Sequence, residues 1–198
     1  LRKLMPRISA ERRQDRYSSI LDAARRVLAE NGLHGTSMAD VARDAGVSDG
    51  LLYRYFESKR ALLDTVLKEF YEGLLSRLES EVFRLATFED QFHRLVELHL
   101  TTFVEDPGLC RLFISEVRVV SSYRGSETQL LNRRYTKVLL RLMERAQKER
   151  HVRSGVDLTL FRDLVFGGIE HLAWRHVNGG RKLDIAQDAK VICTILLE

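Results

Sequence analysis

Histidine and cysteine are the side chains here that could act as catalytic bases, nucleophiles or metal ligands, and the sequence holds 6 and 2 of them. His171 and His176 stand five positions apart, whereas the two ligands of an HExxH site stand four apart on one helix face. Neither Cys110 nor Cys193 has a suitable base near it in the sequence, and no phosphate-binding glycine loop occurs. We therefore expect no catalytic residue, no metal and no cofactor, and the pattern argues against an enzyme.

Basic residues gather at the start of the chain, where they could bind a polyanion. The first 60 residues hold four more basic than acidic residues and the remainder holds equal numbers, so the whole formal charge of +4 lies in the first third. A positive segment on an otherwise neutral body is typical of a nucleic-acid-binding module, although a surplus of this size does not establish one.

Residues 37–56 combine two short helical patterns with a glycine between them. Gly46 permits the positive φ of a tight turn, and Ala42 is small enough for two helices to cross closely. The apolar or small positions expected to pack this motif are Val41, Ala42, Ala45, Val47, Leu52 and Tyr55. The spacing predicts a DNA-binding helix-turn-helix, and the same spacing also arises by chance in other helical proteins.

The same segment carries a family resemblance. Residues 36–45 read TSMADVARDA and residues 46–63 read GVSDGLLYRYFESKRALL, which closely resembles the signature of the tetracycline-repressor (TetR) family. The similarity covers about residues 11–65, and the rest of the chain matches only in the number, lengths and order of its expected helices. The resemblance implies a transcriptional repressor that binds a double-stranded DNA operator and is released by a small-molecule effector.

The resemblance also implies which residues touch DNA. Ser48 and Gly50 open the recognition helix, and Gly50 lets the backbone approach DNA closely. Tyr53 and Tyr55 are similar to an aromatic pair that contacts phosphate and groove edges, and Lys59 resembles a phosphate-binding lysine at a helix start.

Further positions around the motif are candidates for DNA contacts. Thr36 and Ser37 lie at a helix start that commonly meets phosphate. Asp49 stands where many members of the family have lysine, and an acid near phosphates costs affinity unless it accepts a hydrogen bond from a cytosine amino group or helps to cap its own helix. Arg54 is a donor for guanine, a phosphate contact or a solvated side chain. An N-terminal arm that follows DNA, or a solvated terminus, would contain Arg7, Arg12, Arg13 and Arg16.

The elements that position these residues are all expected to be helices. Only Pro6 and Pro107 interrupt long runs with apolar residues at helical spacing, and the pattern does not alternate as in strands. About nine helices are predicted, at residues 9–32, 36–45, 48–56, 58 to the mid-80s, 88–105, 108–121, 126–151, 156–177 and 183 to the end. We expect an all-α protein with a helix-turn-helix domain at residues 9–56 and a ligand-binding and dimerisation domain at residues 57–198, connected by the helix that starts near residue 58.

Two helices near the end of the chain are apolar on more than one side. Such helices are buried twice, and two of them from each subunit would form the four-helix interface of a homodimer. Gly167 favours close helix approach, or it marks a simple break in the helix. The residues expected at the interface are Phe166, Gly167, Trp174, Val177, Ile185, Ala189, Ile192 and Leu196.

The second domain also has enough aromatic and aliphatic residues to enclose an apolar effector pocket, though many of them would simply be core. The candidates are Phe70, Leu74, Phe92, Leu95, His99, Phe103, Phe113, Arg118, Tyr135, Leu139 and Phe166. His99 would be a polar anchor in the pocket or an ordinary satisfied histidine. His93 would have the same two roles.

A stripe of basic residues lies at i, i+4 spacing in the same domain, formed by Arg133, Lys137, Arg141 and Arg145. Such a stripe is usually solvated. Together with residues 116–118 (EVR) and the helix that contains residues 166–169 (FGGI), the stripe makes the domain similar to fatty-acid-responsive repressors of the family. One hypothesis is therefore an acyl-CoA effector whose acyl chain fills the apolar interior and whose phosphates meet the stripe. The alternative is a DNA-binding regulator, activator or repressor, without any small-molecule ligand.

The apolar segments and the cysteines of the sequence bear on where in the cell the protein is located. No segment reaches about 18 uncharged apolar residues, so no membrane insertion is expected. Two distant cysteines give no disulfide framework, which suits the reducing cytoplasm.

Overall fold

A computed structural model describes residues 10–197, and within that range every regular element is helical, with nine α-helices and two short helical turns. The all-α prediction is confirmed. The helices form two compact units, of which the first ends at Leu67 and the second begins at Lys68. The domain boundary after residue 56 stays a prediction. The first unit extends beyond it and includes the buried Leu62 and Leu63 of the following helix.

The first unit consists of α1 (Ala10–Gly35), α2 (Met38–Asp44), α3 (Asp49–Tyr55) and the start of α4 (Lys59–Glu81). Helical geometry in α1 breaks at Gly32, whose φ of 72° suits glycine. The core between the helices is closed by Leu28 of α1, Val41 of α2 and Leu52 of α3, each fully buried. Ala42 is 1% exposed, so a larger side chain would push α2 off its neighbours.

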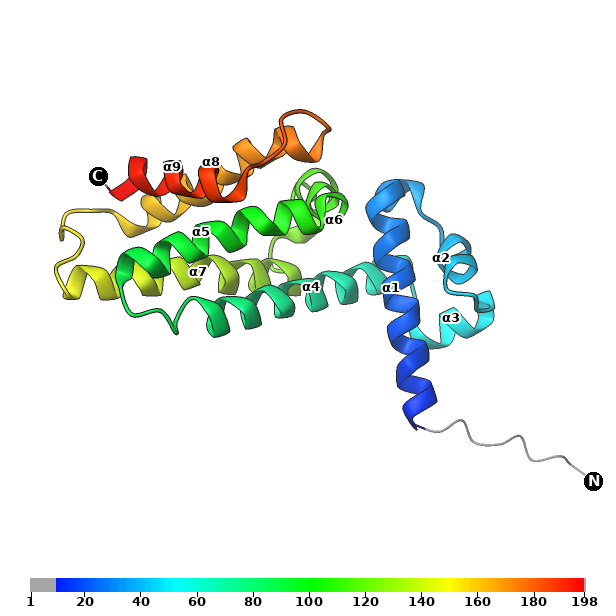
Figure 1. The fold of residues 1–198 in the computed structure, drawn as a ribbon. Helices are drawn as coiled ribbons and strands as arrows, with labels where there is room; N and C mark the ends of the chain where they lie inside the picture. Colours follow the sequence, from blue (N-terminus) through cyan, green and yellow to red (C-terminus); the bar gives the residue numbers. More distant parts are fainter. Residues whose placement is uncertain (1–9, 198) are drawn as a thin grey trace, which may run out of the picture. The chain divides into compact units, whose positions relative to one another are not determined.

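The second unit contains most of α4 and the elements that follow it. These are α5 (Phe88–Glu105), α6 (Pro107–Leu112), a π-helical turn η1 (Phe113–Val117), a 3₁₀ turn η2 (Ser121–Tyr123), α7 (Glu127–Lys148), α8 (Leu158–Val177) and α9 (Ile185–Leu197). Within this unit α5 packs against α6, α7, α8 and α9, and Figure 1 shows it between α4 and the α8–α9 pair. It is therefore the central helix of the unit.

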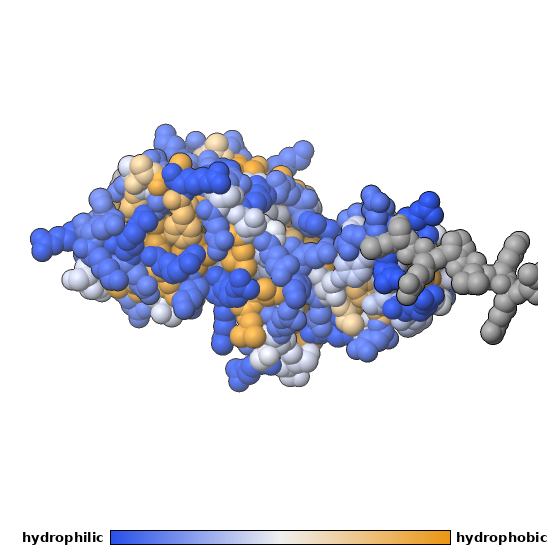
Figure 2. Space-filling model, turned by 90° about the horizontal axis from the view of Figure 1, so that it is seen from below, coloured by the Kyte–Doolittle hydropathy of each residue, from blue (hydrophilic) through white to orange (hydrophobic). Residues whose placement is uncertain are grey.

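The surface of the molecule is mixed. Figure 2 shows one face that is largely hydrophilic, with hydrophobic side chains exposed between the polar ones.

The segment 108–121 differs from the single helix expected there. Pro107 starts α6 with Asp106 as its cap, but the helix widens into a π turn at Phe113 and the backbone is extended at Val120 (φ −85°, ψ 148°). Neighbouring β-branched Val119 and Val120 favour extended backbone, which explains why the helix stops early.

Candidate functional site

The helix-turn-helix between α2 and α3 is built from local capping contacts. Ser37 caps α2: its Oγ accepts from the Asp40 backbone N–H at 3.1 Å, and Asp40 Oδ2 accepts from the Ser37 N–H at 3.0 Å. The Ser37 hydroxyl also donates to Asp40 Oδ2 at 2.5 Å, and this hydrogen bond, together with the one from the Ser37 N–H, holds the pKa of the Asp40 carboxyl below its ordinary value. Gly46 makes the turn with a φ of 65°, and Ser48 caps α3 by accepting from the Leu51 N–H at 3.3 Å. Both helix starts are thus fixed by residues within the motif.

The start and outer face of α3 are exposed, as a recognition helix requires. Ser48, Asp49, Gly50 and Arg54 are all exposed, and Tyr53 is 53% exposed. Asp49 lies in the first turn of α3, where its negative charge interacts favourably with the helix dipole. The residue that caps the helix is Ser48, not Asp49.

The two tyrosines of α3 point in different directions. Tyr55 is half-buried, and its ring lies 6.2 Å from that of Tyr17 on α1, which stacks in turn on Phe56 at 5.6 Å. Tyr53 remains free for a partner, whereas Tyr55 is partly used to hold α3 against α1.

Two of the predicted phosphate contacts are engaged with the end of α1. Lys59 Nζ donates to the backbone carbonyls of Leu33 and Thr36, both at 2.6 Å. Thr36 is buried and its hydroxyl donates to the Gly32 carbonyl at 2.7 Å. Lys59 therefore interacts favourably with the C-terminal dipole of α1 and has one N–H left for another acceptor. Of Thr36 and Ser37, only Ser37 is exposed.

A basic groove of about 310 Å³ lies between α1 and α3. It is lined by Arg13, Arg16, Leu51, Arg54 and Tyr55. Arg13 and Arg16 are thus part of α1 and share a surface with Arg54, a grouping that the spacing along the chain did not reveal. Arg7, also named for the arm, lies outside the described residues.

In the second unit, an apolar cavity of about 60 Å³ is lined by Phe70, Tyr71, Leu74, His99, Thr102, Phe103, Cys110, Phe113, Ile114, Tyr135 and Glu170. Six of the predicted pocket residues are in this set. The π turn η1 supplies Phe113 and Ile114, and such turns are frequent at functional sites. Neither Tyr71 nor Glu170 was among the predicted residues.

One polar pair lies in the apolar wall of this cavity. His99 Nδ1 is 2.8 Å from the hydroxyl of Tyr135, and the His99 ring contacts Phe103 and Phe166 edge-on. Burial lowers the pKa of His99 to about 3 and raises the pKa of Tyr135, so both side chains are neutral near pH 7.

The other predicted pocket residues lie elsewhere. Phe92, Leu95 and Leu139 are at most 1% exposed and belong to the packed core. Arg118 and Phe166 line a neighbouring open groove of about 790 Å³ between α7 and α8. Phe166 also lies against the cavity, with its ring 4.8 Å from His99 and 5.7 Å from Tyr135. It therefore separates the cavity from the groove.

The groove carries basic side chains from α7 and from the segment that follows the π turn. Arg133 and Lys137 are exposed on α7, and Arg118 follows the π turn. Arg118 donates to both carboxylate oxygens of Glu170 on α8, at 2.7 and 2.6 Å, which raises the pKa of the guanidinium. Glu170 lines the cavity as well as the groove.

The predicted basic stripe on α7 is divided by its surroundings. Arg141 lies 5.1 Å from the centre of the Phe83 ring, and Arg145 donates to the side chain of Gln91. Only Arg133 and Lys137 of the four line the groove. A larger open groove of about 920 Å³ is lined by the start of α5, by residues 151–156 and by α9, and its lining mixes acidic, basic and apolar residues.

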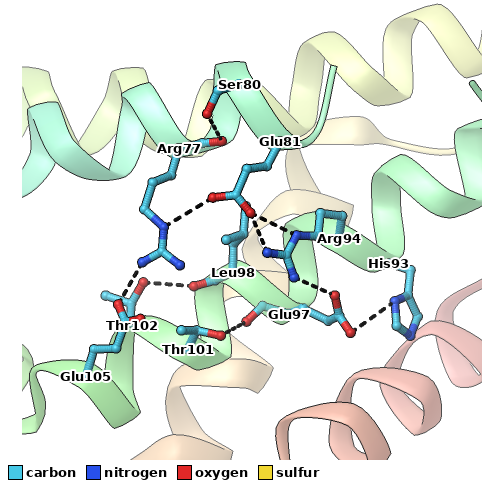
Figure 3. Close-up of polar contacts among 10 residues, drawn as sticks. All are labelled: Arg77, Ser80, Glu81, His93, Arg94, Glu97, Leu98, Thr101, Thr102 and Glu105. Carbon is cyan, nitrogen blue, oxygen red and sulfur yellow. Dashed lines mark hydrogen bonds and ion pairs between the residues drawn. The ribbon is translucent and has the colours of Figure 1, made fainter. Parts of the chain in front are cut away.

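An ion-pair network ties α4 to α5 (Figure 3). Arg94 of α5 donates to Glu81 of α4 and, at 2.8 Å, to Glu97, and Arg77 of α4 donates to Glu105 at 2.6 Å. Hydrogen bonds from Arg94 hold the pKa of the Glu81 carboxyl below its ordinary value. The network fixes the C-terminal end of α4 to the central helix.

The residues predicted for a dimer interface fall into two groups. Val177 and Ala189 are buried within the protomer, because α8 and α9 both pack on α5. Ile185, Ile192, Leu196 and Phe166 are half-buried, and Gly167 and Trp174 are exposed. The exposed apolar residues are instead Leu160 and Leu164, one turn apart on α8, and Val191 and Ile195, one turn apart on α9, which are 58%, 60%, 45% and 73% exposed. Helix periodicity gave the apolar faces of α8 and α9, but not which of them turns outward.

Residues 10–197 offer neither a metal site nor a membrane-spanning helix. No group of three or more histidine, cysteine, aspartate or glutamate side chains is placed to hold a metal ion. No helix in that range combines the length and the hydropathy needed to cross a bilayer.

Two family models match consecutive parts of the chain. Residues 20–66 match the model described as bacterial regulatory proteins of the tetR family, and residues 67–198 match the model of the C-terminal region of YsiA-like protein.

Full-length relatives are similar as well. The Fatty acid metabolism regulator protein of Bacillus subtilis (strain 168) is 25% identical over 187 residues, covering 94% of this chain and 96% of the relative. A crystal structure of the transcriptional regulator FadR from Bacillus subtilis in complex with stearoyl-CoA superposes with a TM-score of 0.84 at 26% identity, covering 92% of this chain and 98% of the other. The fatty acid degradation regulator FadR from Bacillus halodurans gives 0.79 at 26% identity, with 91% and 97% covered.

Proposed function

Because this chain belongs to the TetR family of bacterial regulatory proteins, with a YsiA-like C-terminal region, we propose that it is a dimeric repressor released from its operator by a long-chain acyl-CoA. Family membership makes it a DNA-binding transcriptional regulator rather than an enzyme. A regulator of this kind must reach chromosomal DNA, so the proposed location is the cytoplasm.

The position of the apolar cavity beside the groove between α7 and α8 carries the proposal for the effector. An acyl-CoA combines a hydrocarbon chain with a coenzyme bearing several phosphates, so its site needs an apolar chamber next to a positive surface. The cavity has an aromatic and aliphatic lining, and the groove beyond Phe166 carries Arg133 and Lys137. A similar regulator has been crystallised with stearoyl-CoA, which supports the same ligand class.

The cavity must enlarge to take such a chain. Its volume of about 60 Å³ compares with roughly 300–1,000 Å³ for ordinary ligand pockets. Phe166 separates the cavity from the groove, so we expect its ring to move when the chain enters. An effector that binds the enlarged state better than the small one shifts the protein towards it, and the same shift can weaken DNA binding.

For DNA recognition, the proposal uses the exposed residues of α3. Ser48, Gly50, Tyr53 and Arg54 face the operator, and the Arg13–Arg16–Arg54 groove adds phosphate contacts. One helix-turn-helix makes few contacts, so two protomers joined through α8 and α9 would read the two halves of a near-palindrome.

The effector is tested with a series of saturated acyl-CoAs, from butanoyl to stearoyl, and with free coenzyme A as the control. Long-chain members are expected to raise the melting temperature and to release operator DNA, whereas free coenzyme A does neither. If no member stabilises the protein or weakens DNA binding, the regulator acts without this ligand class.

The operator is found by selecting bound sequences from a random duplex library at a stated salt concentration. A palindromic consensus is expected for a dimer. Enrichment of a single half-site, or of nothing, would contradict the proposed mode of DNA reading.

A further inference from the structure

The ion pair between Arg118 and Glu170 stands where the apolar cavity meets the groove between α7 and α8. Its two hydrogen bonds of 2.7 and 2.6 Å join the segment after the π turn to the middle of α8. Glu170 is the member that lines both spaces. An acyl chain lying in the cavity would therefore bring its head group close to this carboxylate.

The charge of the ligand's head group determines whether Glu170 repels the ligand. The thioester of an acyl-CoA is uncharged, and its phosphates lie many bonds further out, towards Arg133 and Lys137. A free fatty acid ends in a carboxylate directly at the end of the chain. Two carboxylates held a few ångströms apart repel each other, and Glu170 is only partly exposed, so solvent screens this repulsion incompletely.

No other group at the cavity is placed to neutralise a fatty-acid carboxylate. The lining contains no lysine or arginine among the described residues, and His99 is uncharged near pH 7 because burial lowers its pKa to about 3. Arg118 could pair with a carboxylate, but two of its N–H groups already donate to Glu170, so a ligand carboxylate would have to compete with Glu170 for the guanidinium.

We propose that Glu170 is a specificity-determining residue that excludes free fatty acids and restricts the effector to thioesters of the same acids. It acts by repelling a carboxylate at the mouth of the cavity and by keeping Arg118 engaged. The inference rests on the proposed acyl-CoA effector and assigns the discrimination between activated and free acids to one side chain.

The test compares palmitoyl-CoA with palmitate, each below its micelle concentration, by titration calorimetry on the purified full chain. The wild type is expected to bind palmitoyl-CoA and to bind palmitate at least about a hundredfold more weakly. Glu170→Gln is expected to bind palmitate at least about tenfold more tightly than the wild type, because the repulsion is gone and Arg118 is released. Its affinity for palmitoyl-CoA should change much less.

Asp163→Asn is the matched control. Asp163 lines the same groove but pairs with Arg162 rather than Arg118, so its variant lowers the groove's negative charge equally and should keep the wild-type preference. An equal gain for palmitate in both variants would reduce the effect to general electrostatics and overturn the inference. No gain in Glu170→Gln would overturn it as well.

A measurement on the wild type needs no variant. The uncharged thioester S-palmitoyl-N-acetylcysteamine lacks the phosphates and should still bind more tightly than palmitate. If it binds no better than palmitate, Glu170 does not select against charge. If the wild type binds neither palmitoyl-CoA nor this thioester, the proposed function itself fails. If it binds palmitate as tightly as palmitoyl-CoA, only the present inference fails.

Discussion

At the scale of single residues, two positions combine a functional role with a measurable physical property. Gly50 is exposed in the first turn of α3, and a Cβ added there would meet nothing within 4 Å. His99 is a buried neutral imidazole paired with Tyr135. Gly50 bears on how closely DNA can approach α3. His99 makes the stability of the protein depend on pH through a residue of the cavity wall.

Replacing Gly50 by alanine should separate folding from DNA binding. The Cβ has free space within the protein, and alanine is the better helix former by about 1 kcal/mol, so the variant should be as stable as the wild type or more stable. The methyl group would instead stand between α3 and DNA, and operator affinity should fall by about tenfold or more, a loss of roughly 1.4 kcal/mol. Thermal denaturation and fluorescence anisotropy with operator DNA measure the two effects.

Gly73→Ala is the control, because Gly73 is also exposed within a helix and open to a Cβ. It should gain similar stability and leave operator affinity unchanged. Unchanged DNA binding in Gly50→Ala would refute the close approach of the α3 backbone.

His99 should make the protein less stable as the pH falls from neutral. Its pKa is about 3 in the folded protein against an ordinary value of 6.5, so between these values the unfolded chain binds a proton that the folded protein does not. The contribution of His99 to the free energy of unfolding is therefore fully present above pH 6.5 and is lost as the pH falls towards 3. Between pH 6.5 and pH 5 the loss amounts to up to about 2 kcal/mol.

The measurement is urea denaturation at pH 7 and pH 5 for the wild type and His99→Gln, which keeps a hydrogen-bonding group next to Tyr135. The decline of the unfolding free energy should be smaller in the variant. Equal declines would mean that His99 takes up its proton without unfolding the protein.

At the scale of elements, α4 belongs to both compact units and is held to α5 by the network of Arg77, Glu81, Arg94, Glu97 and Glu105 (Figure 3). The N-terminal turns of α4 contain Lys59, and its later turns supply Phe70 and Leu74 to the cavity wall. A change at the cavity can therefore reach the first unit through one continuous helix, provided that the helix is anchored at its far end.

Glu81→Gln should weaken that anchor. Losing the charge that pairs with Arg94 and Arg77 should cost little stability, about 1 kcal/mol or less, because the pairs are partly exposed. Hydrogen exchange in the last turn of α4 should become faster, and acyl-CoA should release less DNA at the same occupancy. Glu79→Gln, exposed on the neighbouring position of α4, should resemble the wild type. A Glu81→Gln protein with unchanged effector response would show that the network is not needed for transmission.

At the scale of the whole molecule, the outward apolar residues of α8 and α9 need a partner. Leu164 and Ile195 are 60% and 73% exposed on the two helices proposed to join the protomers. Large exposed apolar residues that gather on one face are typical of interaction surfaces.

Leu164→Glu should separate the dimer. Two buried charges, one from each protomer, would enter the proposed interface, so sedimentation velocity should show monomers and operator affinity should fall by about a hundredfold or more. Leu130→Glu, at a leucine of α7 that is 54% exposed, should leave both properties unchanged. A Leu164→Glu protein that remains dimeric would place the interface elsewhere.

The sequence alone was sufficient for the helix-turn-helix and for the all-α class. Ser37, Gly46 and Ser48 act on backbone groups within a few residues of themselves, so their spacing is enough to predict the two helix starts and the turn. Helical periodicity likewise depends only on neighbours three and four positions away.

Only the tertiary structure decided which apolar residues enclose a cavity and which basic residues face it. Phe70 and Phe92 look alike in the sequence, yet one lines the cavity and the other is core. Arg118 and Glu170 are 52 positions apart, and their meeting depends on how the segment after η1 packs on α8. Periodicity defines the face of a helix, but the neighbour that the face meets is set by packing between distant segments, and the candidate effector site lies where such segments meet.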